Sequence, residues 1–468
     1  MQNKVLQEKR GALLGLTMST FVMQFMNILV NNVDQLMISR YSQDAVAAVG
    51  NANQISWLLM LFFTVLSTAS VILVTQYKGA KNTEREHEIY VISLAFNVVL
   101  GLVIGVICIA FGRQIFALMN VDSPQIAEFA YQYLAITGGA SIIQALIMSY
   151  SAIFRANAMA KQTMLISILI NILNVFGNWL LIYGQGPFPE LGVRGVAIST
   201  VVSRLIGLII TVIVFRRRIG RLRWKLLWPF PWRQFGKLIG IGVPAAGENL
   251  SYDLAQLAIM GFINTMGLVA VNTKIYAVII TQCAYVFANS LADATQVYLG
   301  YLLGAGRHDD ADKRLMKTLV TGVVSTVALT AVIYCFSDVI FGIFVANDAE
   351  NMALRSDILV LAKRIMLIEI VLEIGRAMNL VMVRGLQTAG DIKFPVFMCM
   401  VCSWTLSVLG GYILGIALGW GLVGIWIGMA IDECVRGTIL VIRWRAGGWR
   451  RLNIVEEKIK GRRREQTA

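Results

Sequence analysis

Long apolar runs separated by short polar segments make up most of the chain. A helix crosses ~30 Å of hydrocarbon with about 20 apolar residues. The runs show no period-two alternation, so they predict spanning helices rather than the strands of a membrane barrel. Twelve such runs lie near residues 13–37, 49–76, 89–111, 130–153, 163–184, 195–215, 238–262, 273–300, 318–340, 358–382, 394–417 and 422–443. We therefore expect an all-α polytopic membrane protein.

The composition supports this expectation. Hydrophobic residues make up 57% of the 468 residues and charged residues 15%, against roughly 45–50% and about 25% in soluble domains. A soluble protein this apolar could not cover its surface with polar groups. The composition therefore excludes a disordered chain, a disulfide-rich secreted domain and an ordinary cytosolic enzyme.

The net charge of +14 reflects basic residues on one side of the predicted membrane. Segments on the side of the amino terminus hold 31 of the 41 Lys and Arg residues. The opposite loops hold only Arg40, Arg113, Arg194, Lys274 and Arg355. Because basic loops stay cytoplasmic, we expect both termini to be cytoplasmic, in a plasma membrane such as the inner membrane of a bacterium.

A polar segment at residues 216–237 divides the apolar pattern near the middle of the chain. It combines eight basic residues with Trp224, Trp228 and Trp232. Indoles favour headgroup depth and basic residues favour anionic lipid, so this pattern predicts an interfacial cytoplasmic linker and argues against a nucleic-acid site. The expected organisation is an amino-terminal six-helix lobe (1–215), the linker (216–237), a carboxy-terminal six-helix lobe (238–443) and a basic tail (444–468).

The two halves repeat each other. A constant offset of 229 positions joins identical residues of the two halves: Arg155 and Arg384, Ala160 and Ala389, Tyr183 and Tyr412, Gly192 and Gly421, and Gly195 and Gly424. Each half has six predicted spans, so both copies enter the membrane in the same orientation. We expect a pseudo-twofold along the membrane normal, with a midplane cavity between the lobes.

Five segments match a known family in order along the chain: VDQLMISRYSQDAVAAVG (33–50), VTQYKGAKN (74–82), GPFPELGVRGVAIST (186–200), GVPAAGENL (242–250) and VRGLQTAGDIKFP (383–395). Together with twelve spans and the repeat, they resemble the multidrug and toxic-compound extrusion (MATE) family over essentially the whole length. The resemblance implies a two-lobed helix bundle that exports organic, often cationic compounds. It also implies a secondary antiporter driven by inward flow of H⁺ or Na⁺, with no other cofactor, and we expect it to act as a monomer.

Asp34 is the first candidate for the coupling residue. An ionisable residue within a span is expensive and points to function, and Asp34 matches the acidic residue of the family motif. The resemblance places its partners at Asn174, Asn178 and Thr200, but Asn178 stands where the family has an aspartate. An amide can bind Na⁺ or a carboxylate and cannot take up a proton, so a Na⁺ site at Asp34, Asn174 and Asn178 is one expectation. Interhelical hydrogen bonding of the two amides is the alternative.

The second half carries further acidic candidates, Glu248, Asp253 and Glu373. Glu248 follows Pro244, where the helix can open backbone carbonyls. Glu373 lies near a position where some MATE subgroups use an acidic residue in cation binding, but Arg376 at i+3 offers a structural ion pair instead. For Asp432, Glu433 and Arg436 in the last span, the spacing favours structural pairing at i+3 and i+4.

Methionine, glutamine and tyrosine residues in the spans could line an adaptable drug cavity. The candidates are Met23, Gln24, Met26, Tyr150, Gln256, Met260, Tyr276 and Gln282. Cys399 and Cys402 form a CxxC pair without further ligands, which favours helix packing over zinc. The sequence has no phosphate-binding loop and no catalytic constellation, so an ATP-driven pump and a membrane enzyme are not favoured. A flippase for lipid-linked saccharides, from the wider superfamily, remains the alternative function.

Overall fold

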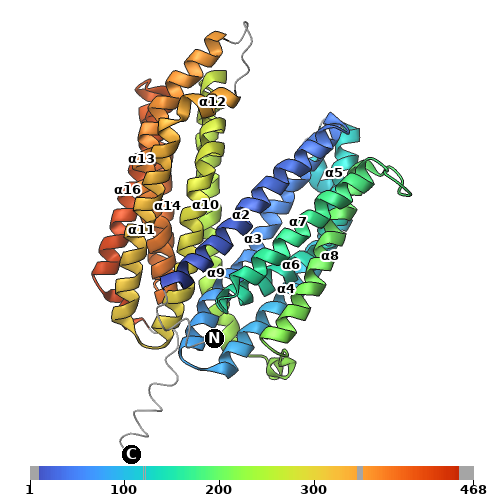
Figure 1. Cartoon of the computed structure of the whole chain (residues 1–468), viewed down its shortest axis with the longest axis vertical. Helices are drawn as coiled ribbons and strands as arrows, with labels where there is room; N and C mark the ends of the chain where they lie inside the picture. Colours follow the sequence, from blue (N-terminus) through green and yellow to red (C-terminus); the bar gives the residue numbers. More distant parts are fainter. Residues whose placement is uncertain (1–9, 120, 122, 345–351, 453–468) are drawn as a thin grey trace, which may run out of the picture. The chain divides into compact units, whose positions relative to one another are not determined.

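A computed structural model of the chain describes residues 10–119, 121, 123–344 and 352–452. This described part contains helices and no strands (Figure 1). Its first half consists of α2 (Arg10–Ser39), α3 (Gln43–Gly79), α4 (Thr83–Leu118), α5 (Pro124–Gly139), α6 (Ser141–Ala156), α7 (Ala160–Ile182), α8 (Gly192–Arg218) and the short η1 (Trp224–Leu227). Its second half consists of α9 (Trp232–Asn264), α10 (Leu268–Gly304), α11 (His308–Cys335), α12 (Ser337–Phe344), α13 (Met352–Ala389), α14 (Lys393–Cys402), η3 (Ser403–Leu409), α15 (Gly410–Tyr412), η4 (Ile413–Ala417), α16 (Gly421–Arg445) and η5 (Gly448–Arg451).

All twelve predicted spans are helical, which confirms the all-α expectation. Among the described residues, eight helices are long and apolar enough to cross a membrane. The pair α5 and α6, bent by 49°, makes a ninth if it is one span. The other three predicted spans are α9, α13 and α16, which carry Glu248, Glu373 and Asp432. The least apolar spans are therefore those that contain the acidic candidates of the second half.

Polar residues between the spans set where helices begin. The side chain of Asn82 accepts a hydrogen bond from Arg85 N at 3.3 Å at the start of α4. Ser123 accepts from Ile126 N at 3.5 Å, and Pro124 follows it at the first position of α5. Such residues satisfy backbone donors that a helix start leaves free, so short loops suffice between long helices.

The chain forms two compact units, Leu14–Val243 and the part from Pro244 onward. In the amino-terminal unit, small residues let helices approach closely, as in other membrane bundles. Ala45, Ala48 and Ala52 of α3 are fully buried in its core. A side chain at Gly101 of α4 would meet the backbone of Ile142 at the start of α6. This packing holds the helices that frame the first candidate site.

In the carboxy-terminal unit, α13 packs against α10, α11 and α16. The closest approach is made at two glycines, because a Cβ at Gly375 would meet the backbone of Cys434 and one at Gly437 would meet Gly375 O and Met378 Cβ. Helices α13 and α16 therefore lie nearly backbone to backbone. That contact brings the ionisable side chains of the two helices together.

The internal repeat is visible in the backbone. Gly192 and Gly421 stand at the starts of α8 and α16, with φ of +52° and +60° respectively. Three residues further on, Gly195 and Gly424 face the backbone of Leu181 and Leu414, with no room for a side chain. The two turns separated by 229 positions therefore use the same local geometry, which supports the repeat inferred from the sequence.

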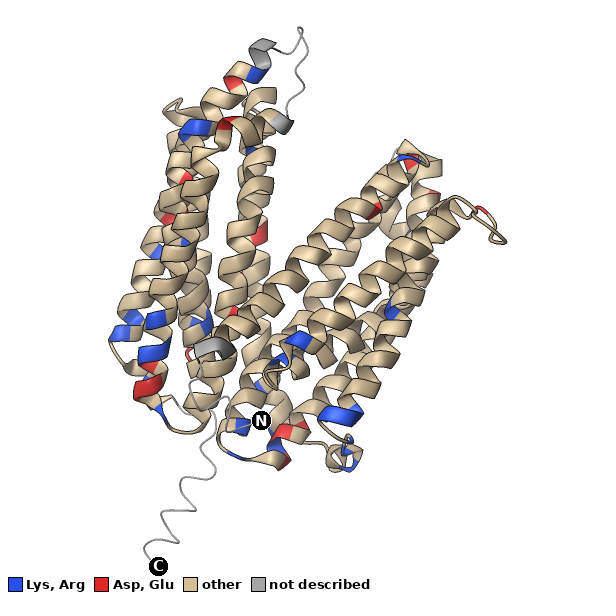
Figure 2. Ribbon diagram, viewed as in Figure 1, with Lys and Arg blue, Asp and Glu red and all other residues tan. Residues whose placement is uncertain are grey.

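The linker residues 216–237 fall within the first unit. The side chains of Trp224, Trp228 and Trp232 are 52%, 90% and 72% exposed. In this unit, most Lys and Arg positions lie toward the end where α3 passes into α4 and α8 ends (Figure 2). The last sixteen residues of the predicted basic tail, with Lys4 and Lys9, lie outside the described residues.

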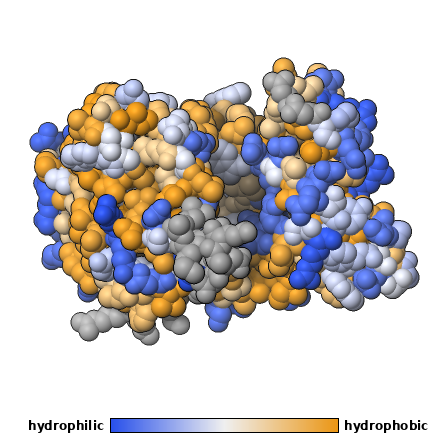
Figure 3. Space-filling model, turned by 90° about the horizontal axis from the view of Figure 1, so that it is seen from above, coloured by the Kyte–Doolittle hydropathy of each residue, from blue (hydrophilic) through white to orange (hydrophobic). Residues whose placement is uncertain are grey.

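Exposed apolar side chains cover the outside of the helices. On α4 they include Val99, Leu102, Val106, Ile109 and Phe111, each at least half exposed. Hydrophobic residues also cover much of the face seen in Figure 3. Contiguous apolar surface of this extent marks contact with lipid in a membrane protein, and the sequence-based expectation of a membrane protein agrees with it.

Candidate functional site

Asp34 of α2 and Asn178 of α7 form the centre of a polar cluster in the amino-terminal unit. Asn178 Nδ2 donates to Asp34 Oδ1 at 2.7 Å, across 144 positions of sequence. Asn178 is fully buried and Asp34 is half-buried. One helical turn further along the chain, Tyr183 donates to the carbonyl of Met37 at 2.7 Å. The two contacts join α7 and its C-cap residue to α2, one at the carboxylate and one a turn further along the chain.

Asn174 and Thr200 extend the cluster to α8. Thr200 Oγ1 lies 3.2 Å from the Asn174 amide and donates to the carbonyl of Val196 at 2.9 Å. With its nitrogen facing Asp34, the Asn174 amide donates to both carboxylate oxygens at 3.1 Å and accepts from Thr200. The structure thus brings together the four residues that the sequence resemblance grouped.

The cluster has hydrogen-bond donors that stabilise a carboxylate. Two amide nitrogens can stabilise an ionised Asp34. The side-chain oxygen of Asn178 has no hydrogen-bond partner among the described residues, although it is buried. With its nitrogen facing Asp34, the Asn174 amide directs its oxygen at Thr200. The contacts therefore suit an ionised Asp34 held by two amide donors, and the sodium site expected at Asp34, Asn174 and Asn178 stays a prediction.

Asp34 opens onto a cavity of about 620 Å³ within the same unit. Amide and hydroxyl side chains form much of its wall, with Asp34 and Arg204 as its charged groups. The amides are Asn27, Asn31, Asn32, Gln35, Asn53, Gln144, Asn171 and Asn174, and the aromatic residues are Trp57, Phe63 and Tyr133. Arg204 was not among the predicted site residues, although its position within a span was a signal for it.

The predicted cavity-lining residues are only partly found at a cavity. Met23 lines a second cavity of about 200 Å³ in the amino-terminal unit. Tyr150 is buried against the ring of Phe215, at 5.2 Å between centroids. Lys274 Nζ lies 3.4 Å from the sulfur of Met260, and Tyr276 packs against the core of the second unit. The side chains of Gln24, Met26, Gln256 and Gln282 are half-buried.

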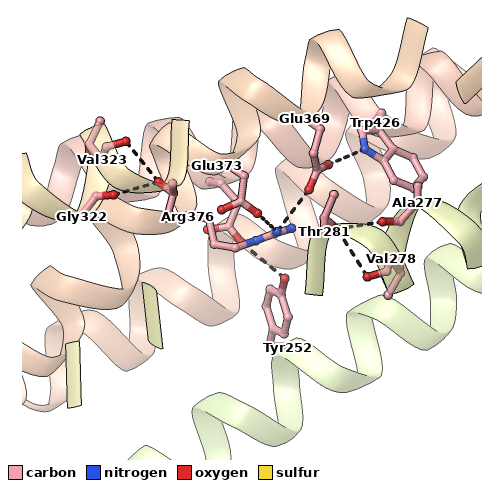
Figure 4. Close-up of polar contacts among 12 residues, drawn as sticks. Tyr252, Ala277, Val278, Thr281, Gly322, Val323, Glu369, Glu373, Arg376 and Trp426 are labelled. Atoms are coloured by element: carbon pink, nitrogen blue, oxygen red, sulfur yellow. Dashed lines mark hydrogen bonds and ion pairs between the residues drawn. The ribbon is translucent and has the colours of Figure 1, made fainter. Parts of the chain in front are cut away.

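A half-buried arginine, Arg376, pairs with the acidic residues of α13. Arg376 Nη1 donates to Glu369 Oε1 at 3.3 Å and also to Glu373 Oε1 (Figure 4). The other oxygen of Glu369 accepts from the indole of Trp426 on α16 at 2.7 Å (Figure 4). Glu373 is fully buried, and its Oε2 has no partner among the described residues. The Glu373–Arg376 pair expected from the i+3 spacing is thus present.

A second arginine, which is buried, lies on α16. Arg436 Nη2 pairs with Glu433 Oε2 at 2.9 Å and with Asp432 Oδ2 at 3.4 Å, which confirms the pairing expected from their spacing. Glu433 also accepts from Asn379 of α13 at 2.7 Å and from Tyr252 of α9 at 3.4 Å. These contacts join three helices around one carboxylate.

Glu248 and Arg384 lie at the edge of the same region. Gln387 donates to Glu248 Oε2 at 2.9 Å, and Arg384 pairs with Asp293 at 3.2 Å. A pocket of about 100 Å³ is lined by Glu248, Tyr252, Tyr285, Arg376, Asn379, Arg384, Gln387, Glu433 and Arg436, among others. Asp253 is half-buried on α9 and is not part of this pocket lining.

The site residues predicted from the sequence do not include Glu369, Asn379, Tyr252 or Trp426. For Glu369 the signal was its position, four residues before Glu373 on the same helical face. For the other three, the side chain type carries no such signal. Only the packing of α9, α13 and α16 shows that they donate to buried carboxylates.

Comparison with known proteins gives one family over most of the chain. The family model described as MatE matches residues 20–180 and 244–413. "Uncharacterized transporter YisQ" of Bacillus subtilis is 35% identical over 443 residues, covering 94% of this chain and 95% of that protein. "Probable multidrug resistance protein NorM" of Thermotoga maritima is 25% identical, covering 97% and 96%.

Solved structures show the same fold. One is described as the outward-facing conformation of a multidrug resistance MATE family transporter, with a TM-score of 0.84 at 19% identity, covering 94% of this chain and 96% of that one. Another, described as MATE in the bent conformation, has a TM-score of 0.85 at 18% identity, covering 96% and 98%. These structures confirm a fold of twelve transmembrane helices in two lobes.

Proposed function

The chain belongs to the MatE family of multi-pass membrane transporters, and on this premise we propose that it is a secondary active antiporter. It exports amphipathic, often cationic organic compounds in exchange for H⁺ or Na⁺. The family consists of transporters, so the chain is a transporter and not an enzyme. Relatives named as multidrug resistance proteins support the proposed class of substrate.

The observation that carries the proposal is the cluster around Asp34. A half-buried carboxylate within a span, held by the amide of Asn178 at 2.7 Å, borders the largest of the cavities described above. Hydrogen bonds between Asp34 and Asn174 and between Asn174 and Thr200 join α2, α7 and α8, so a change in the charge of Asp34 affects all three helices. Binding of the ion and binding of the substrate next to it can therefore favour opposite-facing states, which is the thermodynamic requirement for exchange.

Glu248, Asp253 and Glu373 are proposed as a second set of coupling groups. Glu248 lines the small pocket of the carboxy-terminal unit, and Glu373 is buried beside Arg376 with one unpartnered oxygen. Glu248 accepts from Gln387, so a change of its charge alters a contact between α9 and α13. Glu373 pairs with Arg376 of its own helix, so a change of its charge alters a contact within α13. Asp253 supports this role less directly, because it lies outside the lining of that pocket.

The membrane orientation belongs to the same proposal. We place both termini and the linker 216–237 in the cytoplasm of a bacterial cell, with the exposed Trp224, Trp228 and Trp232 at the level of anionic headgroups. The functional division is then an amino-terminal lobe to residue 215, this linker, and a carboxy-terminal lobe from residue 238. Each chain contains both acidic clusters, so a monomer would be sufficient for transport.

Transport in proteoliposomes tests the proposal. The full chain is reconstituted, a Na⁺ gradient or a pH gradient is imposed separately, and accumulation of a fluorescent organic cation is measured. We expect accumulation under one of the two gradients. The Asp34→Asn variant should lose it, whereas Asp44→Asn, a matched acid in the first turn of α3, should not. Unchanged gradient-driven accumulation in Asp34→Asn would remove Asp34 from the coupling site.

A flippase for lipid-linked saccharides is the weaker alternative. A pyrophosphate headgroup requires several basic side chains facing one cavity. Arg204 is the only basic residue among those that line the 620 Å³ cavity, and Arg155 is the only one lining the 200 Å³ cavity. The described cavities of the amino-terminal unit therefore favour export of organic compounds over transfer of a pyrophosphate.

A further inference from the structure

The buried ionic residues of the carboxy-terminal unit do not balance in charge. Arg376 faces both Glu369 and Glu373, and Arg436 faces both Asp432 and Glu433. Each guanidinium thus meets two carboxyl groups within a predicted span. A net charge buried in such a place is very unfavourable unless a proton or another ion neutralises it.

In the Arg436 cluster, the contacts identify Glu433 as the ionised carboxylate. Its Oε2 accepts from Arg436 at 2.9 Å and from Asn379 at 2.7 Å, and its Oε1 accepts from Tyr252 at 3.4 Å. Three donors from three helices point at this one group. A carboxyl group so surrounded by donors is stabilised in its charged form.

Asp432 has a very different environment. Among the described residues its one contact to a donor is that of its Oδ2 to Arg436 Nη2, at 3.4 Å. Its Oδ1 has no partner among the described residues, although the side chain is only 2% exposed. Arg436 meanwhile directs Nη1 to Cys399 Sγ at 3.0 Å and to Ser403 Oγ at 3.3 Å. The shorter contacts of the guanidinium are thus those to Glu433, Cys399 and Ser403, and its contact to Asp432 is the longest of the four.

From these contacts we propose that Asp432 is a proton-binding residue of the carboxy-terminal unit, neutral while Glu433 is the counter-ion of Arg436. A metal ion is excluded as the neutralising group, because the nearest charged neighbour of Asp432 is a guanidinium and a thiol, Cys402, is also nearby. A hard cation needs several oxygen ligands and no adjacent positive charge. A proton does not need several oxygen ligands, and it can bind to Asp432 beside the guanidinium of Arg436.

The groups that face this cluster come from every neighbouring helix. They are Glu248 and Tyr252 on α9, Tyr285 on α10, Glu373, Arg376 and Arg384 on α13, Cys399 and Cys402 on α14, and Glu433 and Arg436 on α16 itself. When Asp432 loses its proton, a second carboxylate competes for Arg436. The contacts of Arg436 to Cys399 and Ser403 then weaken, so the proton on Asp432 controls how firmly α16 is held to α14 and η3.

Infrared spectroscopy of the purified full chain in lipid nanodiscs tests this inference. A protonated carboxyl group has a C=O stretch that is separate from those of carboxylates and amides, so its loss can be counted. We expect Asp432→Asn to remove one such band at neutral pH. We expect Glu433→Gln to remove the same band, because Asp432 must then ionise to pair with Arg436. A merely structural role of Asp432 would not produce the second result.

The exposed Glu128→Gln, whose side chain pairs with Arg113 at 3.3 Å in the other unit, is the matched control and should leave the band unchanged. Retention of the band in either Asp432→Asn or Glu433→Gln would overturn the proposal. If Glu433→Gln does not fold, the test compares two variants of Asp432. Asp432→Asn should lack the band, and Asp432→Glu, which keeps a carboxyl group at this position, should show it. The band is independent of the proposed antiport, so it remains a valid test even if the chain proves to be driven by Na⁺ alone.

Discussion

Asn178 donates to Asp34 at 2.7 Å, and this single contact joins α7 to α2 at the edge of the cavity of about 620 Å³. The acceptor can change its charge and the donor cannot. In a site with two carboxylates, like charges would force one proton to be shared. Here the partner of Asp34 is an amide, so Asp34 is the one group of this contact whose charge can change.

The first prediction concerns this contact. Asn178→Ala removes a hydrogen bond to a charged group, which contributes about 1.5–3 kcal/mol. We expect gradient-driven accumulation in proteoliposomes to fall by roughly tenfold or more. Asn178→Asp should instead retain accumulation and add one bound proton, measured by potentiometric titration. Full activity of Asn178→Ala would show that the amide does not position Asp34.

The second prediction concerns the indole of Trp426, which donates to the buried Glu369 at 2.7 Å. Trp426→Phe leaves that oxygen without a donor, at a cost of about 1–3 kcal/mol. The midpoint of thermal unfolding in detergent should fall clearly. Trp420→Phe, where the indole is 54% exposed, is the control and should change the midpoint little. Equal midpoints for the two variants would contradict a stabilising role of this hydrogen bond.

The third prediction concerns the contact between α13 and α16 at Gly375. Gly375→Ala places a Cβ against the backbone of Cys434 and Glu433, which cannot move like a flexible side chain. Overpacking of this kind costs about 1–3 kcal/mol. Gly50→Ala, in a helix with nothing within 4 Å of the new Cβ, should be neutral or stabilise by about 0.5–1 kcal/mol. Thermal unfolding of both variants checks the opposite signs.

The fourth prediction concerns the linker and anionic lipid. Arg217, Arg218, Arg221 and Lys225 are exposed, and each basic residue near an anionic surface contributes about 1 kcal/mol. Replacing all four by Gln should reduce the stabilisation of the chain by anionic nanodiscs relative to neutral ones. High salt should reduce it in the same way. Arg40→Gln, in an opposite loop, serves as the control, and an equal loss there would argue against the proposed orientation.

The sequence by itself determined the number and places of the spanning helices. A span needs only a continuous apolar run of sufficient length, and such runs can be recognised without tertiary contacts. The repeat could also be recognised from the sequence, because glycine stands at corresponding places in the two halves. Gly192 and Gly421 have a positive φ, which other residues rarely adopt. Gly195 and Gly424 lie against backbone atoms that leave no room for a side chain. Asp34 and its amide partners could be grouped from the family resemblance, and the hydrogen bond from Asn178 matches that grouping.

Only the tertiary structure decided which buried acids have donors. Glu433 is held by Asn379 and Tyr252, from positions 54 and 181 residues away, whereas its neighbour Asp432 has an unpartnered oxygen. In the sequence the two adjacent acids look equivalent, since both can reach Arg436. The difference arises because burial makes the charge of a carboxyl group depend on every donor within hydrogen-bond distance. Those donors come from helices that only packing brings together.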